Sequence, residues 1–202
     1  MSVTTNLTSV LTFNKDGMAD IANDESATMW AFLIALLGSL IGFIAGLLAF
    51  MALDETDYLT EALYEAAQTI FMTAAVTALV MQIVMLFIFA GVMAFVLRGF
   101  GGTATLIQCL RVFGFTQIWA AIGSVINLIL SLGDISLGID AGLILGLVGL
   151  VAFIIGLTSF SGLSLGSAII AVIIAYILAL VLVVIVAFIV ALVLVVALIG
   201  ML

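Results

Sequence analysis

The chain has 202 residues, of which 67% are hydrophobic and 7% are charged, and it contains no proline. A soluble domain carries about 25% charged residues, so this composition excludes a water-soluble globular protein and favours an integral membrane protein. The formal net charge of −8 includes only three basic residues, which argues against nucleic-acid binding because that binding depends on Lys and Arg.

The composition also restricts the chemistry. The chain has no histidine and one cysteine, Cys109, so zinc sites, iron–sulfur clusters and histidine-bound haem lack their ligands. We expect Cys109 to be a small buried apolar residue. General acid–base catalysis needs a titratable pair within hydrogen-bond reach, and no acidic residue interrupts an apolar run. We therefore predict no catalytic residue, no metal site and no cofactor.

Residues 1–28 precede the first long apolar stretch. Leu7, Val10 and Leu11 fall on one helical face, with polar residues between them. The positive start and small-residue cleavage site of a signal peptide are not found in this segment. We predict one or two short interfacial helices that lie on the membrane on its cytoplasmic side.

The first two predicted spans cover residues 29–53 and 69–97, both uncharged and long enough to cross a bilayer. In the first span, glycine recurs at every fourth position and predicts a helix-packing face: Gly38, Gly42 and Gly46. The second span has Gln82 near its middle. A single amide at that depth is more often hydrogen-bonded to a neighbouring helix than used as a substrate ligand.

An acidic segment, residues 54–68, joins these two spans. Asp57, Glu61 and Glu65 would share one helical face. Such stacked carboxylates could hold a divalent cation or form a solvated face above the membrane. We favour the solvated face, because cation sites with oxygen ligands draw on several chain segments.

The whole sequence is organised around Leu97–Gly114 (LRGFGGTATLIQCLRVFG), which follows the second span. Gly101 and Gly102 predict a sharp turn, and Thr103 could cap the helix that follows. The stretch also holds Arg98 and Arg111. The two arginines either contact lipid phosphate or a partner, or extend to the membrane surface and set the topology; we favour the second interpretation.

Three further spans are predicted at residues 113–132, 141–160 and 167–202. The third includes Gln117 and Asn127, and a second glycine ladder accompanies the fourth: Gly138, Gly142 and Gly146. The last stretch is uncharged and would form a helix about 54 Å long, against a hydrocarbon core of about 30 Å. Because tilt cannot absorb all of that excess, we predict that its last turns pack against another protein or another copy of the chain.

The few basic residues predict the orientation. Lys15, Arg98 and Arg111 place the N-terminus and the loop between spans two and three in the cytoplasm. With five spans, the C-terminus lies outside. The predicted fold is thus an all-α, polytopic helical bundle, with one membrane domain over residues 29–202 and short interfacial helices before it.

The central stretch resembles the Yip (Ypt-interacting protein) domain family of five-span membrane proteins, especially its prokaryotic members. The matching segments are residues 98–102 (RGFGG), residues 111–115 (RVFGF) and the lead-in at residues 11–24. The family commonly has prolines where this chain has Asn14 and Trp119. Eukaryotic members are associated with Rab GTPases through a longer N-terminal segment. For prokaryotic members, the resemblance implies five spans, a cytoplasmic N-terminus and no established activity.

Taken together, the sequence predicts a non-catalytic membrane scaffold or adaptor, either Yip-like or an accessory subunit of a larger complex, in the plasma membrane of a prokaryote. Its partners would be membrane lipid and other integral membrane subunits or a second copy, and the candidate contact residues are Arg98, Gly101, Gly102 and Arg111. The alternative is a small-solute transporter or channel component, for which the polar candidates within the spans are Gln82, Gln117 and Asn127.

Overall fold

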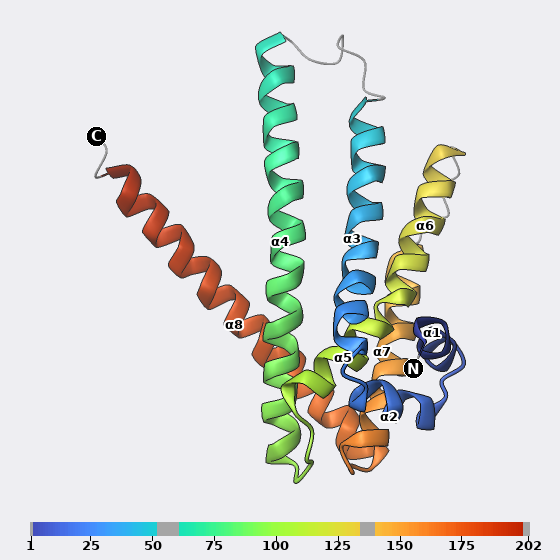
Figure 1. The fold of residues 1–202 in the computed structure, drawn as a ribbon. Helices are drawn as coiled ribbons and strands as arrows, with labels where there is room; N and C mark the ends of the chain where they lie inside the picture. The colour runs from blue at the N-terminus through green and yellow to red at the C-terminus, as the bar shows by residue number, and fades with distance from the viewer. Residues whose placement is uncertain (1, 52–60, 134–139, 200–202) are drawn as a thin grey trace.

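In the computed structural model, the described residues are 2–51, 61–133 and 140–199, and every regular element among them is an α-helix (Figure 1). In chain order these helices are α1 (Val3–Leu11), α2 (Lys15–Asn23), α3 (Ala27–Met51), α4 (Glu61–Gly99), α5 (Leu106–Thr116), α6 (Ile118–Leu132), α7 (Ala141–Phe160) and α8 (Leu165–Ile199). Within these ranges, five stretches are long and apolar enough to cross a membrane: α3, α4, α5 with α6, α7 and α8. The predicted all-α fold with five candidate spans is confirmed.

The third span differs from the prediction because it consists of two helices. It begins at Leu106 rather than near residue 113, and it is interrupted at Gln117. Thr105, and not Thr103, caps its start: the Thr105 hydroxyl accepts from the Gln108 amide N–H at 3.2 Å. The Gln108 side chain in turn accepts from the Thr105 N–H at 2.9 Å, which completes a capping box.

The upright helices α3, α4, α6 and α7 stand side by side, and α5 crosses between them near one end of the bundle (Figure 1). We call this end the base. It comprises α1, α2, α5 and the connections over residues 100–105 and 161–164. Both short N-terminal helices are thereby gathered around the start of the third span.

Most apolar side chains of α1 and α2 are covered by protein, although Leu11 is exposed. Val10, Met18, Ile21 and Ala22 are fully buried where these helices pack against α5 and, for α2, also against α7. The two short helices are present as predicted, but their buried apolar residues contact the bundle and are not left for lipid.

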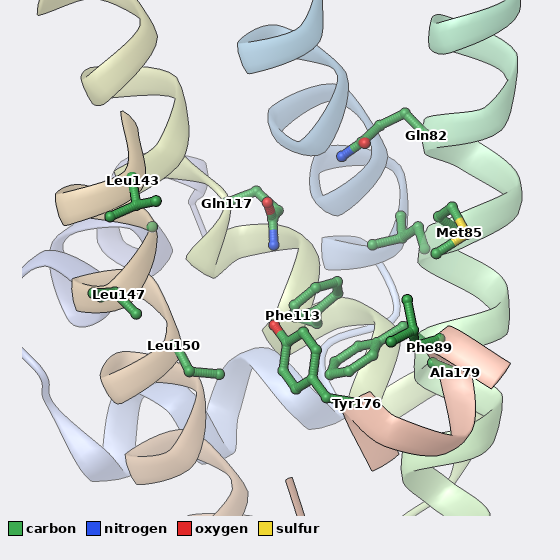
Figure 2. A pocket seen from close by; sticks show the side chains of 13 residues that line it. Gln82, Met85, Phe89, Phe113, Gln117, Leu143, Leu147, Leu150, Tyr176 and Ala179 are labelled. Carbon is green, nitrogen blue, oxygen red and sulfur yellow. The ribbon is translucent and has the colours of Figure 1, made fainter. Parts of the chain in front are cut away.

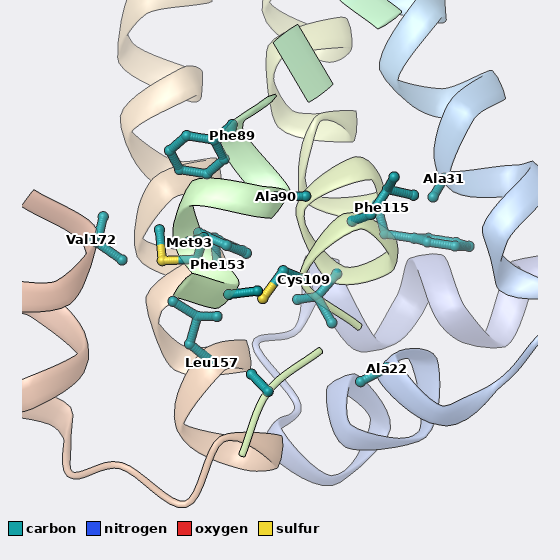
Figure 3. Close-up of a cluster of buried hydrophobic side chains, with 14 of the residues drawn as sticks. Ala22, Ala31, Phe89, Ala90, Met93, Cys109, Phe115, Phe153, Leu157 and Val172 are labelled. Atoms are coloured by element: carbon teal, nitrogen blue, oxygen red, sulfur yellow. The ribbon is translucent and has the colours of Figure 1, made fainter. Parts of the chain in front are cut away.

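The core lies just above the base, where α4, α5, α7 and the first turns of α8 meet. Its buried side chains include Met93, Cys109, Phe153 and Leu157 (Figure 3), so the expected burial of Cys109 is confirmed. Above them, Phe89 packs against three other aromatic rings with centroid distances of 4.3 to 5.8 Å: Phe113, Phe153 and Tyr176. Aromatic pairs at such separations stabilise a core beyond the area they bury.

Helix α8 is continuous and leaves the bundle obliquely (Figure 1). Along its first half, small residues are buried at helical spacing where α8 packs against α4 and α7: Ala168, Ala171, Ala175 and Ala179. Beyond them, Leu180, Val184 and Phe188 are 65%, 60% and 68% exposed. Among the α8 side chains that the structure describes, those buried in the bundle therefore end at Ala179.

Candidate functional site

Gly101 and Gly102 form the turn that ends α4. Gly101 has a φ of +84°, a conformation that glycine adopts without steric strain. The Gly102 N–H donates to the Leu97 carbonyl at 2.9 Å. A Cβ atom at Gly102 would lie 3.0 Å from that oxygen and 3.2 Å from the Ser161 carbonyl oxygen. The glycine pair thus allows the end of α4 to approach the α7–α8 connection.

The two arginines lie in different environments. Arg98 is exposed in the last turn of α4, whereas Arg111 is only 9% exposed. The Arg111 Nε donates to the Thr28 hydroxyl at 2.8 Å, and its Nη1 donates to the Ala22 carbonyl at 2.9 Å. Since Ala22 lies in α2 and Thr28 in α3, the Arg111 guanidinium joins three helices at the base.

A second polar contact supports this junction. The Gln108 side-chain amide donates to the Asn23 side-chain oxygen at 3.0 Å. Gln108 and Arg111 lie on α5, and their partners belong to the end of α2 and the start of α3. The structure therefore gives Arg111 an internal positioning role that the sequence pattern did not indicate.

The glycines of the two predicted ladders have unequal surroundings. A Cβ atom at Gly38 would lie 3.4 Å from the Ala121 Cα of α6, whereas at Gly42 and Gly146 it would meet no heavy atom within 4 Å. Gly142 lies beside the Asp140 carboxylate, 2.9 Å from such a Cβ. Gly138 and the surroundings of Gly46 fall outside what the structure describes.

Closer helix approaches occur at Gly114 and Gly123, which lie outside those predicted ladders, although the neighbour of Gly123 is the ladder residue Gly142. A Cβ atom at Gly114 would lie 2.7 Å from the Ala31 carbonyl oxygen, and at Gly123 it would lie 2.5 Å from the Gly142 Cα. The recurrence of glycine at every fourth position of one segment cannot reveal such contacts. They depend on which glycine of one helix faces which residue of another.

Asn127, one of the polar candidates within the spans, hydrogen-bonds to the start of α7. Its side-chain nitrogen donates to the Asp140 carboxylate at 2.7 Å, and its side-chain oxygen accepts from the Ala141 N–H at 3.0 Å. Asp140 also caps α7 by accepting from the Leu143 N–H at 3.2 Å. The bond from Asn127 and the bonds from the helix N–H groups lower the pKa of Asp140 below its usual value of 3.8.

The other two candidates, Gln82 and Gln117, face a cavity of about 530 Å³ between α4, the α5–α6 junction, α7 and α8 (Figure 2). Neither side-chain amide has a hydrogen-bond partner among the residues that the structure describes. A smaller cavity of about 300 Å³ also borders both amides, together with Ser39 and Ser124. The structure thus brings together two polar residues that lie on separate predicted spans.

A groove of about 410 Å³ lies between α4 and α8 where α8 departs from the bundle. Its lining is apolar and includes a glycine on α4: Gly91, Val92 and Phe95 of α4, with Leu178, Val181, Leu182 and Ile185 of α8. We call this feature the α4–α8 groove. Its walls belong to two diverging helices, so its outer side is open.

The proposed cation site in the acidic segment falls largely outside the described residues, which exclude Asp57 and the side chains of Glu61 and Glu65. Among the residues described, no three His, Cys, Asp or Glu side chains gather in a way that could hold a metal ion.

Comparison with known families gives a match over nearly the entire chain. The sequence model of the family described as the Yip1 domain matches residues 8–202. Comparisons with curated proteins and with solved structures give no match.

Proposed function

Because the chain belongs to the Yip1 domain family of membrane proteins, we propose that it is a non-catalytic membrane scaffold, or adaptor, that binds another integral membrane protein. The partner is a second copy or a subunit of a larger complex, for which this chain would be an accessory subunit. The binding surface is the α4–α8 groove together with the exposed α8 residues Val184 and Phe188.

The observation that carries this proposal is the divergence of α8 from α4. Helices in membranes associate mainly by close packing, and their interfaces favour small residues that let two backbones approach. The α4–α8 groove has Gly91 on one wall and the exposed residues Val181 and Leu182 on the other. An apolar helix from a partner would fill this groove and cover the exposed α8 side chains beside it, such as Val184 and Phe188.

The positions of the basic residues support a cytoplasmic base. Lys15, Arg98 and Arg111 all belong to elements of the base or to the end of α4 that enters it. By the positive-inside rule, the N-terminus would face the cytoplasm and the far end of α8 the opposite side. In a prokaryote this membrane would be the plasma membrane.

The proposal is tested by filling the α4–α8 groove. Val181 and Ile129 are both exposed apolar residues, 49% and 62% respectively, but only Val181 lines the groove. Val181→Trp should lower the native mass of the complex extracted in mild detergent, because the indole occupies the partner's position. Ile129→Trp, the matched control on α6, should leave the mass unchanged. A wild-type chain that migrates as a lone monomer would refute the proposal.

A transporter is the second candidate, favoured by the break in the third span at Gln117. Discontinuous helices that line a cavity near mid-membrane are typical of secondary transporters. The measurement is glycerol flux into proteoliposomes, followed by light scattering. A scaffold gives the rate of empty liposomes, whereas a transporter gives a faster rate that falls in Gln82→Leu and Gln117→Leu variants.

A further inference from the structure

The cavity beneath Gln82 and Gln117 combines unpartnered polar groups with an apolar interior. Its polar groups are the two side-chain amides and the Tyr176 hydroxyl, which come from α4, the α5–α6 junction and α8. Figure 2 shows the Gln117 amide and the Tyr176 hydroxyl directed into the space between α4 and α7. None of the three side chains donates to or accepts from another side chain or backbone group within the described part of the chain.

These polar groups lie at membrane depth. At about 1.5 Å per residue, Gln82 is about 25 Å from the end of α4 at Gly99, and Tyr176 is about 17 Å from the start of α8 at Leu165. Gln82, Gln117 and Tyr176 each lie in a stretch long and apolar enough to cross a membrane, whose hydrocarbon core is about 30 Å thick. Because hydrocarbon offers no hydrogen-bond partner, amides left open at this depth are unfavourable unless something in the cavity binds them.

The lining determines which chemistry fits. No charged side chain lines the cavity within the described residues, so a charged ligand would remain unpaired there. A glutamine amide offers both donors and an acceptor, which suits a hydroxyl or carbonyl group. The remaining lining is aromatic or aliphatic and includes Phe89, Phe113 and Leu150. The volume of about 530 Å³ is within the range of about 300–1,000 Å³ that is usual for small-molecule sites.

Access to the cavity is from the bilayer. Leu143 and Leu147 of α7 and Leu180 of α8 line the cavity and are also among the most exposed apolar side chains of these helices. The rim between α7 and α8 is therefore open on the lipid-facing side. A ligand dissolved in the membrane can enter laterally, with its tail extending past these leucines.

We propose that this cavity binds a neutral, membrane-soluble amphiphile with a single hydroxyl or carbonyl head group, held by Gln82, Gln117 and Tyr176. The head group hydrogen-bonds to the amides, and the apolar body lies against the aromatic cluster. This site is separate from the α4–α8 groove on the outer side of α8. A test of ligand binding in the cavity is therefore independent of a test of the scaffold function.

The test uses the full chain in lipid nanodiscs and a photoreactive, alkyne-tagged analogue of 1-hexadecanol. Labelling should map by mass spectrometry to peptides around Leu147 and Tyr176. Unlabelled 1-hexadecanol should compete, by about fivefold for each hydrogen bond that its head group makes, better than hexadecane, which has no head group. Palmitate, which is charged, should compete more weakly than the alcohol. Equal competition by the alcohol and the alkane would overturn the proposal.

Two pairs of variants locate the site. Gly146→Leu fills the cavity and should abolish the labelling, whereas Gly42→Leu, at an equally open glycine away from the cavity, should not. Gln82→Leu and Gln117→Leu should remove the advantage of hexadecanol over hexadecane. Saturable labelling that persists in Gly146→Leu, or no saturable labelling of the wild-type chain, would contradict the proposal. The competition in the wild-type chain needs no variant and so does not depend on how the variants fold.

Discussion

Arg98 and Arg111 carry the same charge and lie close together in the sequence, but protein encloses only Arg111. Its acceptors are the Ala22 carbonyl and the Thr28 hydroxyl, which belong to segments far away in the chain. Sequence patterns place an arginine near a membrane surface by counting charges in loops. They cannot show which distant carbonyl it will meet, so the positioning role of Arg111 required the structure.

This contrast predicts unequal effects of removing the two charges. Arg111→Leu should lower the free energy of unfolding by about 2–4 kcal/mol, because two hydrogen bonds from a charged donor are lost at a buried junction. Arg98→Leu, at an exposed position, should change it by less than about 0.5 kcal/mol. Reversible unfolding in mixed micelles measures both. Equal losses in the two variants would show that the Arg111 contacts are not stabilising.

Asp140 gives a pH-dependent prediction, again from a single side chain. Because hydrogen bonds lower its pKa below 3.8 in the folded chain, its carboxylate contributes stability that is fully present above that value. The contribution is lost as the pH falls through the lower pKa of the folded state. The melting temperatures of the wild-type chain and Asp140→Ala should therefore differ at pH 6 and converge below pH 3.8. A constant difference across this range would contradict the assignment.

At the scale of elements, hydropathy and length predicted the five candidate spans, because an uncharged apolar helix of about 20 residues is long enough to cross the hydrocarbon core. The division of the third span at Gln117 was not predicted. No proline or charge marks it, and Gly114 nearby serves a close contact with Ala31. The glycine ladders likewise predicted close helix packing. They did not predict which residues of the neighbouring helices would be contacted, because that depends on how each helix is rotated about its axis.

Glycine substitutions test which helix contacts are close. Gly114→Ala should lower stability by about 1–3 kcal/mol, since its Cβ would meet the Ala31 backbone of α3. Gly42→Ala, where no heavy atom lies within 4 Å, should be neutral or raise stability by up to about 1 kcal/mol through helix propensity. In the same unfolding assay, the two substitutions should change the free energy of unfolding in opposite directions. A neutral Gly114→Ala variant would mean that α3 and α5 can separate at little cost.

At the scale of the whole molecule, the helices pack together at the base, whereas α8 diverges from the bundle towards the opposite end (Figure 1). The base is tied together by Arg111, by the Gly102 turn and by the buried faces of α1 and α2. Towards the opposite end, α8 separates from α4 (Figure 1). The excess length of the last span led to the prediction that its last turns pack against another protein or another copy, and this remains a prediction. The α4–α8 groove could not be predicted, because it depends on the angle at which α8 leaves α4.

The most direct test of the scaffold proposal is photo-crosslinking in intact membranes, with a photoreactive amino acid at Val181 in the α4–α8 groove and, as a control, at Ile129 on α6. A partner helix in the groove predicts a discrete protein adduct from position 181 and only lipid adducts from position 129. Lipid adducts alone at both positions would mean that lipid fills the groove, and the scaffold proposal would be contradicted.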